Sequence, residues 1–78
     1  MRLSIEQVIQ QATLQLQNSS DSAKLDVELL LAHCLHNDRT YLFTWYDKLV
    51  TEDEKVAFNK LLARRLEGEP VAYILGHQ

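Results

Sequence analysis

The chain has 78 residues with 8 basic and 11 acidic side chains, which give it a formal net charge of −3. This length predicts one small domain, and the 46% hydrophobic content excludes a disordered segment. The acidic balance argues against nucleic acid as a direct partner, because phosphate binding needs clustered positive charge.

The composition favours an all-α domain. Only two Gly and one Pro are available for turns, whereas the helix-forming residues Leu, Gln, Ala, Glu and Lys are abundant. The single cysteine, Cys34, excludes an internal disulfide. The first apolar residues, Leu3 and Ile5, alternate with polar ones, so we expect no leader, no membrane span and a cytoplasmic location.

The first helix is predicted over residues 4–17. Ser4 and Gln7 have the spacing of a capping box, and Leu3 and Val8 that of the hydrophobic staple that accompanies one. One stripe of this helix collects the apolar residues Ile5, Val8, Ile9, Ala12 and Leu16. The polar residues 18–21 end the helix and offer caps for the next one.

A second helix is predicted over residues 22–35. Its broad apolar face is formed by Ala23, Val27, Leu30, Leu31, Cys34 and Leu35. Nearly opposite lie Leu25, Leu29 and Ala32, which leave Lys24, Asp26, Glu28 and His33 as polar exceptions. A helix that is apolar on two sides is usually surrounded by others, so we place this one at the centre of a bundle.

The stretch from 39 to 46 is predicted to be a short helix that follows an N-cap at Asp38. Its aromatic residues alternate as in a strand, but no second strand candidate exists to pair with them. We favour core positions for these rings over an interface, and expect at least one to stay partly exposed. They are Tyr41, Phe43, Trp45 and Tyr46.

A fourth helix is predicted over residues 52–67 and begins with a second capping box, Thr51 and Glu54. Acidic residues at its start (Glu52, Asp53 and Glu54) and basic residues at its end (Arg64 and Arg65) complement the helix dipole. The residues expected to face inward are Ala57, Phe58, Leu61, Leu62 and Leu66.

A fifth helix is predicted over residues 70–75. Gly68 is placed as the left-handed cap that ends the fourth helix, and Pro70 as the first residue of the fifth. Gly76 closes the fifth helix. The sequence therefore predicts a five-helix bundle that occupies residues 1–78.

No residue pattern predicts catalysis or metal binding. His33, Cys34 and His36 are the only cluster of metal-ligand types and lack the fourth ligand of a closed zinc site. Neither glycine belongs to a phosphate-cradling motif. The serines in the turn at residues 19–22 and the acidic residues 52–54 are interpreted as helix caps and dipole partners. We expect no catalytic, cofactor-binding or metal-binding residue.

A DNA-reading helix-turn-helix is disfavoured by the charge of the fourth helix. A recognition helix contacts bases through the residues of its first turn. Here that turn carries three acidic side chains.

Four segments carry patterns more specific than helix formation requires. The segment 64–76 reads RRLEGEPVAYILG, in which a basic residue and a short gap precede Gly-Glu-Pro, a hydrophobic residue, Ala-Tyr and Gly. The segment 25–33 reads LDVELLLAH. These segments resemble the closing signature and the D-A-E-x-L-L helix of the N-terminal domain of the HemK/PrmC-type release factor glutamine methyltransferases, with Val27 where Ala is commoner. Residues 39–42 and 49–51 also fall in register with that family.

This resemblance implies an S-adenosylmethionine-dependent enzyme that methylates the side-chain amide of the glutamine in the Gly-Gly-Gln motif of peptide-chain release factors. In the family, the catalytic Rossmann-like domain follows the helical domain. We therefore expect residues 1–78 to lack the catalytic domain, to be inactive alone and to bind no S-adenosylmethionine. The expected partners are the release factor and the catalytic domain.

Two alternatives remain open. The domain either docks the release factor or mainly braces the catalytic domain, through an apolar patch around Tyr73, Ile74 and Leu75. A related branch of the family methylates a ribosomal-protein glutamine and tends to lack the Gly-Glu pair. The presence of Gly68 and Glu69 favours the release-factor branch.

Overall fold

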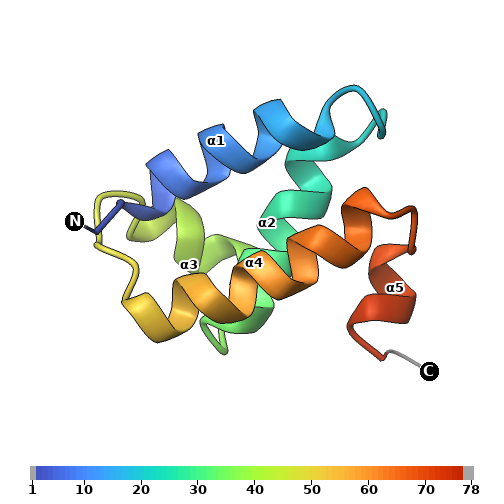
Figure 1. Ribbon diagram of the computed structural model, residues 1–78. Helices are drawn as coiled ribbons and strands as arrows, with labels where there is room; N and C mark the ends of the chain where they lie inside the picture. The colour runs from blue at the N-terminus through green and yellow to red at the C-terminus, as the bar shows by residue number, and fades with distance from the viewer. Residues whose placement is uncertain (1, 77–78) are drawn as a thin grey trace.

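The computed structural model describes residues 2–76 and confirms the predicted all-α fold. Its elements are α1 (Ile5–Leu16), α2 (Ala23–Cys34), α3 (Arg39–Thr44), α4 (Glu52–Leu66) and α5 (Val71–Ile74). Every helix lies within two residues of its predicted range. Figure 1 shows α2 in the middle, with α1 and α4 on either side of it, and α5 beside the C-terminal end of α4.

Helix α1 begins as predicted. The Ser4 hydroxyl accepts a hydrogen bond from the Gln7 backbone N–H, and the Gln7 side chain accepts one from the Ser4 N–H. The predicted apolar stripe is buried in full. Two other N–H groups of the first turn donate to carbonyls far along the chain. The Ile5 N–H donates to Lys48 and the Glu6 N–H to Tyr46, both at 2.9 Å. These bonds attach the start of α1 to the connection between α3 and α4.

Helix α2 is the centre of the bundle, as predicted, because α1, α3, α4 and α5 all pack against it. Its apolar side chains Val27, Leu30 and Leu31 are fully buried. The helix ends with His36 in the left-handed region at φ 58°, and the N–H of Asn37 donates back to the Ala32 carbonyl. A histidine therefore occupies a position that glycine more commonly takes.

Two carboxylates of α2 are buried, which its apolar pattern alone did not predict. Asp26 is 7% exposed and Glu28 is 2% exposed. Arg65 of α4 donates to Asp26 at 3.1 Å, and Arg39 of α3 donates to Glu28 at 2.8 Å. The hydroxyls of Ser20 and Ser22 also donate to Asp26, at 2.8 and 3.3 Å. Each carboxylate therefore joins α2 to a different helix.

Helix α4 begins with the predicted capping box of Thr51 and Glu54. Its buried face is narrower than predicted, because Phe58 and Leu62 are buried whereas Ala57 and Leu66 are exposed. The prediction was wrong for those two residues because the main packing partners of α4 are only two helices, α2 and α5. A helix at the edge of a bundle buries only a narrow stripe.

The turn from α4 to α5 follows the Gly-Glu-Pro sequence. Gly68 has φ 106° and ends α4 as predicted. The N–H of Glu69 donates to the Arg64 carbonyl, and its side chain accepts two bonds from the Arg64 guanidinium. Pro70 is the N-cap, so α5 begins one residue later than predicted.

We predict that the substitution Arg65→Met lowers the free energy of unfolding by about 3 kcal/mol, because it leaves the Asp26 carboxylate buried without its cation. Urea denaturation followed by far-ultraviolet circular dichroism measures the change. The matched control is Lys60→Met, which removes an exposed cation of the same helix and should cost at most about 0.5 kcal/mol. Equal effects of the two substitutions would contradict a structural role for the Asp26–Arg65 pair.

Candidate interaction surface

Helix α3 and the turn after it expose three aromatic side chains. Phe43, Trp45 and Tyr46 are 55%, 50% and 52% exposed, and Tyr41 is half-buried. The prediction that these aromatics mainly fill the core was wrong, because the core position is taken by Leu42. A helix of six residues turns only one narrow side toward its neighbour. The expectation that at least one ring stays partly exposed is confirmed.

Two rings of this aromatic group contact cations, the exposed Phe43 and the half-buried Tyr41. The guanidinium of Arg39, already paired with Glu28, lies 5.7 Å from the centre of the Phe43 ring. The Lys48 ammonium donates to the Tyr41 hydroxyl at 2.9 Å and lies 5.6 Å from the centre of that ring. Cation–π contacts of this kind limit the rotamers of both partners. We call Phe43, Trp45 and Tyr46 the aromatic surface.

The backbone beneath the aromatic surface is also constrained. Asp38 caps α3 as predicted, accepting a bond from the Tyr41 N–H. The Tyr46 carbonyl accepts a hydrogen bond from the Glu6 N–H of α1, and the Lys48 N–H donates to the Trp45 carbonyl at 2.9 Å. A surface whose backbone and side chains are ordered before binding loses less entropy when a partner binds.

The predicted helix-end residues pair more specifically than their dipole role requires. Arg64 and Glu69 form a two-bond ion pair that lowers the pKa of the Glu69 carboxyl. Arg65 reaches Asp26 across 39 residues of sequence. In the turn before α2, the Ser20 hydroxyl accepts the Ser22 N–H. The N-cap Ser22 makes no side-chain cap bond, so the interpretation of these serines as helix caps was wrong for Ser22.

The patch predicted around α5 is smaller than expected. Ile74 is buried and Leu75 packs against the core, so only Tyr73 remains exposed, at 69%. The Arg64 guanidinium lies 6.0 Å from the centre of the Tyr73 ring. The prediction of a three-residue patch was wrong because one turn of helix directs its apolar positions toward α2 and α4.

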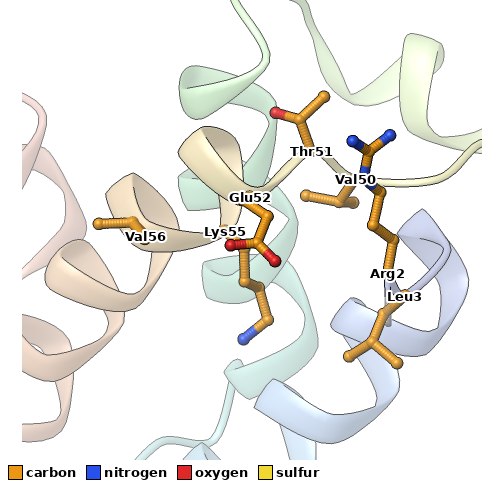
Figure 2. Close-up of a pocket in the computed structure, with 7 residues that line it drawn as sticks. All are labelled: Arg2, Leu3, Val50, Thr51, Glu52, Lys55 and Val56. Atoms are coloured by element: carbon orange, nitrogen blue, oxygen red, sulfur yellow. The ribbon is translucent and has the colours of Figure 1, made fainter.

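A hollow between the N-terminal segment and the start of α4 is shown in Figure 2. It measures about 180 Å³, and Arg2 and Leu3 face residues of the segment 50–56 across it. Its charged lining residues are Arg2, Glu52 and Lys55. Ligand sites are usually larger, at about 300–1,000 Å³, so this hollow is a poor candidate for one.

The residues considered for metal binding do not form a site. His33 and His36 are exposed, whereas Cys34 is partly buried. Among residues 2–76 no group of three or more potential metal ligands comes together. Burial, and secondarily the charge of Glu54, raises the pKa of the Cys34 thiol from 9.0 to about 11. The neutral thiol is a weak nucleophile.

Two further properties concern the same part of the chain. No helix within residues 2–76 is long and apolar enough to cross a membrane. Both glycines, Gly68 and Gly76, lie at helix ends in left-handed conformations instead of in a phosphate- or cofactor-cradling loop.

We predict that alkylation of Cys34 by iodoacetamide accelerates with pH around a midpoint near 11 in the folded chain and near 9 in urea. At pH 9 only on the order of 1% of a thiol with this pKa is ionised. Because the unfolded chain releases the thiol proton first, stability should also fall between pH 9 and 11. A midpoint near 9 in the folded chain would contradict the assigned burial.

Comparison with known proteins gives relatives over the whole chain. The chain is 46% identical to the release factor glutamine methyltransferase of Aliivibrio fischeri and 48% identical to that of Vibrio cholerae, in each case over all of this chain and 28% of the relative. It is 51% identical to that of Pseudomonas aeruginosa over 76% of this chain and 21% of the relative. No solved structure matches it significantly.

The chain thus spans about a quarter of the length of the relatives that it matches. The PrmC N-terminal domain family matches residues 7–76, which include in full all four segments that carried the resemblance. The predicted family is confirmed, and the chain belongs to the PrmC N-terminal domain family.

Proposed function

We propose that this chain is the docking domain of an S-adenosylmethionine-dependent methyltransferase that methylates the glutamine of the Gly-Gly-Gln motif in release factors. The names of the relatives support the substrate, since they are release factor glutamine methyltransferases. They also favour a release factor over the ribosomal-protein alternative. We assign methyl transfer to a separate catalytic domain. Residues 1–78 supply the surface that contacts the release factor.

The observation that carries the docking role is the aromatic surface. Three neighbouring rings, each about half exposed, are costly on a surface that contacts only water. Aromatic side chains also concentrate binding energy at protein interfaces. Because Arg39 and the contacts of α1 hold this surface in position, a partner meets a preorganised patch.

The physical reason for a docking domain is the small size of the target. One glutamine side chain offers few atoms for recognition. A second contact on the same protein substrate raises the effective concentration of the glutamine at the catalytic domain. A docking contact that is equally strong in the ground state and the transition state lowers KM for the release factor and leaves kcat unchanged.

We predict that Phe43→Ala in the complete methyltransferase raises KM for the release factor by roughly tenfold, with kcat nearly unchanged. Tyr46→Ala should have the same direction of effect. The matched control is Leu14→Ala. Leu14 is a large apolar residue, 64% exposed near the C-terminal end of α1, whereas the aromatic surface is bonded to the start of α1. Steady-state kinetics with intact release factor measures both constants. KM within twofold of the parent in both aromatic variants would refute docking through this surface.

The second candidate function is bracing of the catalytic domain. Tyr73 favours it, because this ring on α5 is 69% exposed and lies against the Arg64 guanidinium. Bracing through this ring implies that Tyr73→Ala lowers the Tm of the complete enzyme while KM for the release factor stays constant. The two functions are therefore separated by which constant each variant changes.

A further inference from the structure

A buried carboxylate of α2 holds a guanidinium that reaches the aromatic surface. The Glu28 side chain is 3% exposed, and its Oε1 accepts from Arg39 Nε at 3.1 Å and from Arg39 Nη2 at 2.8 Å. Two N–H bonds restrict the orientation of a planar group more than one bond does, because rotation about either bond breaks the other. The Arg39 guanidinium is therefore fixed to α2, although its side chain is 43% exposed.

The same guanidinium lies against the ring of Phe43. Arg39 and Phe43 are four residues apart in α3, so their side chains share one face of that helix. The guanidinium carbon is 5.7 Å from the ring centre, and the ring is 55% exposed. An exposed side chain exchanges rotamers rapidly unless a neighbour favours one of them. The position of Arg39, and through it that of Glu28, thus influences which rotamer of Phe43 is populated.

Asp26 gives a comparison within the same helix. It is also a buried carboxylate with a cation as partner, because Arg65 of α4 donates to it at 3.1 Å. The Arg65 side chain is only 17% exposed, so this pair lies inside the bundle. Loss of either pair is expected to lower the stability of the fold. Of the two pairs, however, it is the one of Glu28 whose cation contacts Phe43.

We propose that Glu28 is a positioning residue for docking, which acts through Arg39 to hold the Phe43 ring in the rotamer that meets the release factor. A ring that already occupies one rotamer loses less entropy when a partner covers it. Glu28 therefore strengthens binding from inside the fold, without touching the partner. The inference rests on the proposed docking function, to which it adds a residue that controls the affinity of that surface.

The first test is the KM of the complete methyltransferase for intact release factor. Glu28→Gln keeps the shape of the side chain but removes the charge that orients Arg39. We expect KM to rise about threefold with kcat nearly unchanged, as for the loss of an exposed cation–π contact. The matched control is Asp26→Asn, which weakens the other buried pair of α2 and should leave KM unchanged. An unchanged KM in Glu28→Gln, or equal rises in both variants, would overturn the proposal.

A double variant makes the test independent of folding. Glu28→Met combined with Arg39→Met removes the buried charge together with its partner, which proteins tolerate far better than the loss of one partner alone. The Tm should therefore stay close to that of the parent enzyme, whereas KM should again rise about threefold. A parental KM in this folded variant would contradict positioning through Arg39.

The route through Phe43 is tested by combining substitutions. If Glu28 acts through the ring, Glu28→Gln adds nothing to the KM of Phe43→Ala, because the group that it positions is gone. A further rise of roughly threefold in that background would mean that Glu28 acts elsewhere, and would overturn the proposal.

Failure of this inference is distinguishable from failure of docking. If Phe43→Ala raises KM for the release factor but Glu28→Gln does not, the aromatic surface docks the partner and the positioning role is refuted. If neither substitution changes KM, docking through the Phe43 ring is refuted as well.

Discussion

The fold depends on how two buried carboxylates of α2 are neutralised. Asp26 and Glu28 are two residues apart, so they point about 200° from each other around the helix. One faces α4 and pairs with Arg65, and the other faces α3 and pairs with Arg39. A buried carboxylate without a cation is strongly destabilising. The two pairs therefore specify which helices lie on opposite sides of α2, where apolar packing alone would accept other arrangements.

The same arrangement gives the chain its exposed aromatic surface. Arg39 contacts Glu28 on one side and the Phe43 ring on the other, so a single guanidinium connects the core to the surface. The bonds from the start of α1 to the carbonyls of Tyr46 and Lys48 fix the following turn. One of the structural ion pairs, Arg39–Glu28, thus holds α3, a helix that buries only Leu42. A well-held helix with little core contribution is what a contact surface requires.

Much of the fold was predictable because local signals dominate short helices. Two capping boxes, the apolar stripe of α1 and the left-handed Gly68 depend on residues a few positions apart. The errors concern tertiary packing. Ring exposure on α3 and the exposure of Leu66 depend on how closely neighbouring helices approach, which no local pattern records. The Asp26–Arg65 pair spans 39 residues. It was signalled only by polar residues on an apolar helix, and both partners lie in the segments that resemble the family patterns.

The central claim is that α3 and its following turn are the part of this domain that meets the release factor. Amide hydrogen exchange of the complete methyltransferase, measured with and without release factor, tests it most directly. Exchange should slow across residues 39–48 when the release factor binds, while the exposed side of α4 near residues 56–60 stays unchanged. Exchange across residues 39–48 that stays unchanged when the release factor binds would contradict the account and favour a bracing domain.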